Sequence, residues 1–92
     1  MKAMIWNKSY WVPVVSPMIL KKEYHDKLIN AGFNILDSIE HHFDPHGYTV
    51  LFLLAESHLA IHTFPEENKT YVELSSCVKD KFDNFVIGLK ND

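Results

Sequence analysis

The sequence has few of the residues that several classes of protein need. Its single cysteine excludes an internal disulfide and a cysteine-rich zinc site. All nine basic residues are lysine and the net charge is −3, so the basic surface of a nucleic-acid-binding protein is missing. The longest apolar run, residues 48–55, is far shorter than the ~20 residues that span a bilayer, and the N-terminal residues lack the pattern of a secretion signal. We therefore expect a cytoplasmic protein that binds neither nucleic acid nor membrane.

The length and composition are those of one small globular domain, which we assign to residues 1–92. Of the 92 residues, 47% are hydrophobic and 13% are aromatic. A domain of this size buries only about 60–65% of the surface of its unfolded chain, so its core is marginal. A partner subunit would add buried surface, and we expect self-association.

The first third of the chain predicts a strand followed by a helix. Residues 9–15 (SYWVPVV) are aromatic and β-branched, but Pro13 has no N–H for a ladder, which favours an edge or bulged strand. A helix is expected over 17–31, with Ser16 as its N-cap and Pro17 in its first position. Gly32 suits the end of this helix. Its apolar residues Ile19, Tyr24, Leu28 and Ile29 have near-helical spacing, which predicts an amphipathic helix with these residues on its apolar face.

The remainder predicts four strands and a second helix. We expect strands over 33–43, 48–55, 58–64 and 70–76, a turn over 44–47, a polar loop over 65–69 and a helix over 78–89. The strand over 48–55 is nearly all apolar, which is typical of burial on both faces. No crossover helix separates the middle strands, so they should pair antiparallel. The fold class is α+β, an antiparallel sheet with two helices packed on one face.

Six histidines invite a search for a metal site, but their positions do not favour one. His58 and His62 have a spacing that brings two imidazoles together on a helix, whereas a strand separates them by ~13 Å. The residues around this pair predict a strand. His41, His42 and His46 flank a turn, where histidines are usually exposed or hydrogen bonded. We expect no metal.

Residues 53–66, LLAESHLAIHTFPE, carry polar side chains at positions where a simple pair of strands would not need them. This segment resembles the self-cleavage motif of the bacterial and archaeal S-adenosylmethionine decarboxylases, in which E-S-H is followed at a short distance by I-H-T-W-P-E. The resemblance continues without a gap through His41, Phe43, Pro45 and Gly47 upstream, and to Cys77 downstream.

The sequence departs from that family pattern at several positions. Phe64 replaces a usual tryptophan, Glu73 a usual aspartate, and Val78 follows Cys77 where the family has glycine. The first strand and helix agree only in pattern. The family members also carry a closing strand that would follow the second helix.

The resemblance implies a proenzyme that cuts itself between Glu56 and Ser57, giving fragments 1–56 and 57–92. Ser57 would attack the Glu56 carbonyl, and elimination would leave a pyruvoyl group, the covalent cofactor, at the head of the second fragment. His62 matches the base that removes the Cα proton. Thr49 stands where the family uses a serine to support processing.

The resemblance also implies a substrate, S-adenosylmethionine, and a lyase that supplies its decarboxylated form for spermidine synthesis. The pyruvoyl group would bind the substrate amine as a Schiff base, and Cys77 matches the proton donor that acts after CO₂ leaves. Phe43 and Phe64 resemble the aromatic residues that flank the adenine and the sulfonium, and Glu66 the carboxylate that holds the ribose. A homodimer is expected.

Two alternatives remain open at this point. The first is a decarboxylase with the same pyruvoyl chemistry but another amino acid as substrate, since the cleavage residues do not select the side chain. The second is a truncated homologue that does not cleave and acts as a structural or regulatory partner. The absent closing strand and the absent glycine after Cys77 keep this second alternative open.

Overall fold

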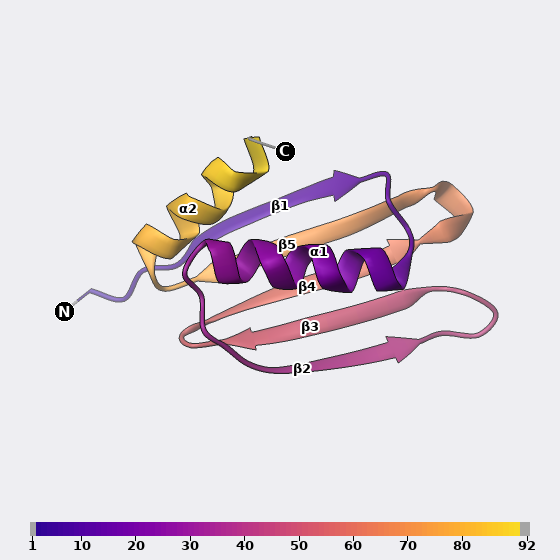
Figure 1. The fold of residues 1–92 in the computed structure, drawn as a ribbon, viewed down its shortest axis with the longest axis horizontal. Helices are drawn as coiled ribbons and strands as arrows, with labels where there is room; N and C mark the ends of the chain where they lie inside the picture. Colours follow the sequence, from indigo (N-terminus) through magenta and orange to yellow (C-terminus); the bar gives the residue numbers. More distant parts are fainter. Residues whose placement is uncertain (1, 91–92) are drawn as a thin grey trace.

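A computed structural model of the chain describes residues 2–90, which form five strands and two α-helices (Figure 1). The strands are β1 (Trp6–Val12), β2 (Ile35–His42), β3 (Tyr48–Leu54), β4 (Ser57–Phe64) and β5 (Lys69–Ser76). The helices are α1 (Pro17–Asn30) and α2 (Lys79–Lys90), and a 3₁₀ turn (Pro65–Glu67) precedes β5. The order of strand, helix, four strands and helix is the predicted one. Neither of these two helices is long and apolar enough to cross a membrane.

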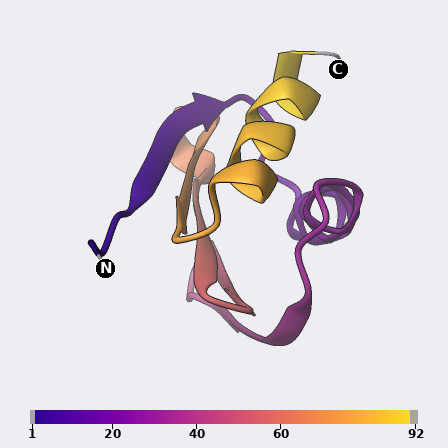
Figure 2. The ribbon, with the colours of Figure 1, turned by 90° about the vertical axis from the view of Figure 1, so that its left-hand side faces the viewer.

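The five strands form one antiparallel sheet in the order β1-β5-β4-β3-β2. Both helices pack on the same face of the sheet, and the end-on view in Figure 2 shows no helix of residues 2–90 on the other face. We call that other face the open face. The core between helices and sheet consists of Leu20, Tyr24, Leu28, Ala31, Phe33, Tyr48, Val50, Phe52, Leu54, Leu59, Ile61, Val72, Leu74 and Phe85. This arrangement confirms the predicted α+β fold class.

Helix α1 is bounded by the residues that predict its ends. The Ser16 hydroxyl accepts a hydrogen bond from the Ile19 N–H at 3.4 Å, and Pro17 occupies the first helical position. Gly32 follows the helix with φ of 96°, a conformation that glycine adopts without steric cost. The local sequence therefore fixes both ends of α1.

The buried row of α1 differs from the predicted one. Leu20, Tyr24 and Leu28 are buried against the sheet, whereas Ile19 and Ile29 are 55% and 49% exposed. Positions four residues apart lie above one another on a helix, so the first three form one continuous row. The prediction was wrong for the two isoleucines, because apolar residues lie on both sides of the buried row and spacing alone does not show which of them face the sheet.

Strand β3 has one buried and one open side. Leu51 and Leu53 point to the open face and are 42% and 53% exposed, while the residues between them face the core. The prediction that this strand is buried on both faces is wrong for the single chain, because both helices cover the same face. Ile39 of β2 pairs with Leu51 and is also exposed. Three neighbouring apolar side chains therefore lie on the open face.

The bounds of the elements differ from the predicted ones by a few residues. Strand β1 ends at Val12 rather than at residue 15, because its ladder to β5 stops before Pro13. It is an edge strand, as this proline predicts. Strand β2 begins later than residue 33 because the Phe33 N–H still bonds to the Leu28 carbonyl at the end of α1. The starts of β4, β5 and α2 are each within one residue of the predicted positions.

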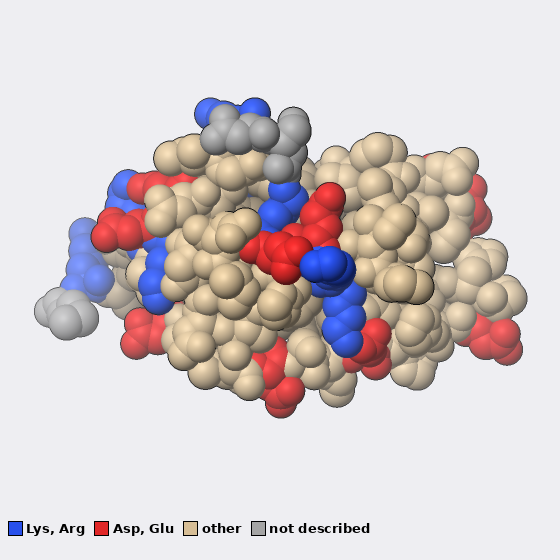
Figure 3. Space-filling view, viewed as in Figure 1, with Lys and Arg blue, Asp and Glu red and all other residues tan. Residues whose placement is uncertain are grey.

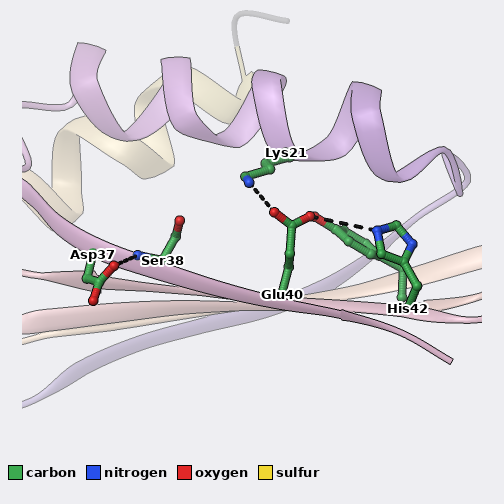
Figure 4. A network of polar contacts seen from close by, with 6 residues as sticks. Lys21, Asp37, Ser38, Glu40 and His42 are labelled. Atoms are coloured by element: carbon green, nitrogen blue, oxygen red, sulfur yellow. Dashed lines mark hydrogen bonds and ion pairs between the residues drawn. The ribbon is translucent and has the colours of Figure 1, made fainter.

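A polar network joins α1 to β2 on the face that carries the helices. Lys21 of α1 forms an ion pair with Glu40 of β2, and His42 lies 3.9 Å from the same carboxylate (Figure 4). The Tyr48 hydroxyl donates to Glu40 at 2.8 Å. Hydrogen bonds from Lys21 and then from Tyr48 hold the pKa of Glu40 below its usual range. On this face lysines and acidic residues lie next to one another rather than in patches of one sign (Figure 3).

Candidate active site

The connection between β3 and β4 is a two-residue turn with strained backbone. Leu54 pairs with Ser57, so only Ala55 and Glu56 lie between the strands. Glu56 has φ of 61°, in the left-handed region where a residue with a side chain costs on the order of 1 kcal/mol. The Ala55 N–H donates to the Asn34 carbonyl at 3.1 Å and holds the turn against the start of β2. Without a glycine, the turn concentrates its strain at Glu56.

The peptide bond that follows Glu56 lies within reach of the Ser57 hydroxyl. Ser57 Oγ is 2.6 Å from the Glu56 carbonyl oxygen. The backbone N–H of Cys77 donates to the same oxygen at 3.1 Å. A carbonyl that accepts a hydrogen bond from an N–H is polarised, and this N–H lies where negative charge would develop if the hydroxyl attacked the carbonyl carbon. The structure thus brings Glu56, Ser57 and Cys77 together.

Ser76 lies directly opposite Ser57 in the ladder between β4 and β5. The two hydroxyl oxygens are 2.7 Å apart, and Ser76 is 1% exposed. It is the last residue of β5 and precedes Cys77, whose thiol is exposed. Ser76 was not among the predicted site residues, because the sequence shows this neighbour only once the register of the two strands is known.

His62 lies near the other end of β4 and pairs with Thr49 of β3. The Thr49 Oγ1 and His62 Nδ1 atoms are 2.9 Å apart. The imidazole also stacks with the Tyr71 ring at a centroid distance of 6.4 Å. These neighbours fix the plane of the ring, and because Thr49 engages Nδ1, proton exchange with a reacting group falls to Nε2.

A pocket of about 400 Å³ opens beside His62 at this end of the sheet. Its lining includes Phe43, His46, Thr49, His62, Phe64 and Glu66. His46 Nε2 is 2.9 Å from Glu66 Oε2, so this histidine is hydrogen bonded, as its position at the turn predicts. The five residues to which the family pattern gives roles in base chemistry, processing support and substrate binding therefore share one pocket.

The histidines are distributed along strands and turns. His58 and His62 both lie on β4, as predicted, and not on a helix. Among residues 2–90, no three His, Cys, Asp or Glu side chains come together in a group that could hold a metal ion.

The predicted site residues form two groups at opposite ends of β4. His62 follows Ser57 by five positions, which corresponds to about 17 Å along a strand. The ladder agrees, since Ser57 pairs with Ser76 whereas His62 pairs with Tyr71. Within one chain, therefore, the His62 imidazole cannot reach Ser57.

Comparisons with known proteins agree with the motif. The family model described as S-adenosylmethionine decarboxylase matches residues 15–90. The S-adenosylmethionine decarboxylase proenzyme 2 of Bacillus anthracis is 49% identical over 47 residues, which are 51% of this chain and 38% of that protein. The S-adenosylmethionine decarboxylase proenzyme of Prochlorococcus marinus (strain MIT 9313) is 51% identical over 47 residues, with 51% and 38% of the two chains covered. The chain spans less than half the length of these curated relatives.

A solved structure has the same fold. The crystal structure of the adenosylmethionine decarboxylase from Aquifex aeolicus VF5 matches with a TM-score of 0.70, covering 98% of this chain and 83% of that one. The sequence identity is 22%, so this likeness concerns the fold alone.

Proposed function

The chain belongs to the S-adenosylmethionine decarboxylase family, and from this membership we propose that it is a proenzyme that cleaves itself between Glu56 and Ser57. Its single domain, residues 1–92, would become fragments 1–56 and 57–92, and the cleaved protein would decarboxylate S-adenosylmethionine. The observation that carries the proposal is the strained turn at Glu56. There the Ser57 hydroxyl and the Cys77 N–H both contact the carbonyl oxygen of the bond to be cut.

Cleavage begins with the attack of Ser57 Oγ on the Glu56 carbonyl carbon. A C–O bond forms, the C–N bond breaks, and the hydroxyl proton ends on the released Ser57 amine, which leaves an ester. A base then removes the Cα proton of Ser57, and the electron pair breaks the Cβ–Oγ bond, releasing Glu56 as a free carboxylate. The unsaturated amine that remains tautomerises to an imine, which water hydrolyses with loss of ammonia. Residue 57 thus ends as a pyruvoyl group.

The surroundings of Ser57 suit a pyruvoyl group at this position. The group would be made from atoms of Ser57 itself, between the Ser76 hydroxyl and the turn that precedes α2. It supplies an electrophilic carbonyl that holds the substrate amine covalently and takes up electrons as CO₂ leaves. The exposed Cys77 thiol, which follows Ser76 directly, is the proton donor that we assign to the former α-carbon of the substrate.

The pocket near His62 has the chemistry to bind the nucleoside and sulfonium of S-adenosylmethionine. Phe43 and Phe64 are both partly exposed, and their ring faces can stack with adenine or attract the sulfonium cation. Glu66 lines the same pocket, and a carboxylate accepts hydrogen bonds from ribose hydroxyls. His46 engages the Oε2 atom of Glu66, so we assign Oε1 to the ribose. The product would serve spermidine synthesis in the cytoplasm.

A second copy of the chain would join the two groups of site residues, and we propose a homodimer for this reason. Two sheets can stack through their open faces about a two-fold axis perpendicular to β4. Such an axis reverses the strand direction in the partner, so the His62 end of one chain approaches the Ser57 end of the other. In this arrangement His62 of one chain is the base for the Cα proton at Ser57 of the other, and Thr49 supports that histidine.

The open face is the surface that we propose for this contact, because it exposes Ile39, Leu51 and Leu53 side by side. A groove of about 370 Å³ runs between these side chains. Leu51→Asp would put a charge into the contact from both chains, so we expect it to convert the dimer to a monomer. Light scattering at micromolar concentration measures the change in mass.

The control for this substitution is Met18→Asp, which puts the same charge on α1, where Met18 is 81% exposed. It should keep the dimer mass. A wild-type protein that remains a monomer, or a Leu51→Asp protein that remains a dimer, would argue against this interface.

An intact-mass spectrum of the purified protein tests the proposed function. We expect the masses of residues 1–56 and of residues 57–92 with a pyruvoyl end, together with CO₂ release from carboxyl-labelled S-adenosylmethionine. A single full-length mass would favour a non-cleaving homologue with a structural or regulatory role. Cleavage without CO₂ release from this substrate would favour a pyruvoyl decarboxylase of another amino acid.

A further inference from the structure

Ser76 is the buried neighbour of the proposed nucleophile. It is 1% exposed, and its Oγ lies 2.7 Å from Ser57 Oγ across the β4–β5 ladder. The same Oγ accepts a hydrogen bond from the Val78 N–H at 3.0 Å and donates to the Val78 carbonyl at 3.3 Å. One hydroxyl therefore links the nucleophile to the backbone that follows β5.

These contacts set the direction of the hydrogen bond between the two serines. A serine hydroxyl has one proton and two lone pairs. Ser76 uses its proton on the Val78 carbonyl and one lone pair on the Val78 N–H, so its second lone pair accepts from Ser57. The single Ser57 proton thus has two acceptors within reach, the Glu56 carbonyl oxygen at 2.6 Å and Ser76 Oγ at 2.7 Å. When Ser76 accepts this proton, the lone pairs of Ser57 Oγ are free to face the Glu56 carbonyl carbon.

Ser76 also positions the N–H group that contacts this carbonyl. Its bond with the Val78 N–H closes a turn around Cys77, the residue between them. The Cys77 N–H donates to the Glu56 oxygen at 3.1 Å. When Ser57 attacks, negative charge develops on this oxygen, and a donor already fixed in place stabilises it. Ser76 thus orients both the attacking oxygen and the donor to the oxygen that takes up the charge.

We propose that Ser76 is a positioning residue for the first step of self-cleavage, the transfer of the Glu56 acyl group from the nitrogen to the oxygen of Ser57. The inference rests on the proposed function. In this step the C–O bond forms, the C–N bond breaks, and the Ser57 hydroxyl proton ends on the released amine, while Ser76 is unchanged. His62 is assigned to the later loss of the Cα proton, so the two residues predict different stalled species.

A matched pair of substitutions tests this role. Ser76→Thr keeps the hydroxyl, and Ser76→Val replaces it by a methyl group of similar size, so both disturb the packing alike. Chains made by cell-free synthesis are followed over time by mass. We expect Ser76→Thr to cleave near the wild-type rate and Ser76→Val to cleave about 10²-fold more slowly. Uncleaved Ser76→Val should resist hydroxylamine, because the bond to Ser57 is still an amide.

The outcomes separate this role from a structural one. Thr70→Val is the control, since it removes another buried hydroxyl of β5, one that donates to the Val14 carbonyl away from Glu56, and it should not affect cleavage. Equal rates for Ser76→Thr and Ser76→Val would overturn the inference, and so would an ester that hydroxylamine cleaves in the valine variant. Circular dichroism checks folding, and Ser76→Ala replaces the valine variant in the comparison if that variant is unfolded.

The wild-type chain distinguishes this inference from the function on which it depends. A wild-type chain that stays whole overturns both. If the wild-type chain cleaves, and Ser76→Val and Ser76→Ala both cleave as fast as the wild type, only the role of Ser76 is overturned.

Discussion

Ser57→Ala should leave the protein as one folded chain of full length. The substitution removes the oxygen that we propose as the nucleophile at the Glu56 carbonyl, so neither the ester nor the pyruvoyl group should form. It also removes the contacts of this hydroxyl with Glu56 and Ser76, at a cost of about 1 kcal/mol each, which a folded domain tolerates. The measurement is intact mass after prolonged incubation, under conditions in which the wild type gives two fragments.

Ser9→Ala is a matched control for the loss of one hydroxyl, because Ser9 lies exposed on the edge strand β1. This variant should cleave like the wild type. Fragments 1–56 and 57–92 from the Ser57→Ala chain would remove Ser57 from the role of nucleophile. Circular dichroism of both variants establishes that each is folded.

A chain with His62→Ala is expected to stall alone and to be cleaved when co-expressed with a Ser57→Ala chain. Alone, it forms the ester but lacks the base, so hydroxylamine should cut it at Glu56. In a mixed dimer, its own Ser57 meets the intact His62 of the other chain, and one complete site results. The expectation follows from the separation of about 17 Å between Ser57 and His62 within one chain.

Two short tags of different mass show which chain is cut in this experiment. The expected product comes only from the His62→Ala chain, because the Ser57→Ala chain has no nucleophile. A partner that carries both substitutions supplies no base and should leave the His62→Ala chain as the ester. Absence of cleavage in the first mixture, with mixed dimers present, would contradict a site shared between chains.

Much of the fold could be predicted because its elements carry local signs. Ser16, Pro17 and Gly32 bound α1, and Pro13 predicts the edge position of β1. The exposure of Leu51 could not be predicted in this way. An apolar strand is consistent with burial on both faces, and only the placement of both helices on one side shows that one face stays open.

Candidate site residues could be named from the sequence, but their arrangement in space could not be predicted. Ser57 and His62 are near each other in the sequence, yet an extended strand puts them at opposite ends of the sheet. Ser76, by contrast, follows Ser57 by 19 positions and touches it. That contact depends on the turn at the end of β4, where Asn68 with φ of 54° returns the chain in register. Residue spacing alone predicts neither the separation of Ser57 from His62 nor the contact of Ser57 with Ser76.

Strands β4 and β5 lie between β1 and β3 in the sheet. A cut after Glu56 would leave β1, β2 and β3 on one polypeptide and β4 and β5 on the other, so the shorter fragment would be enclosed by the longer one. Two ladders, β1–β5 and β3–β4, would then hold the fragments together without a covalent link. Denaturation would separate them, and reassembly would become a bimolecular reaction that dilution opposes. The cleaved protein would thus keep the fold that the uncut chain reaches by itself. After denaturation, however, neither fragment alone could refold to it.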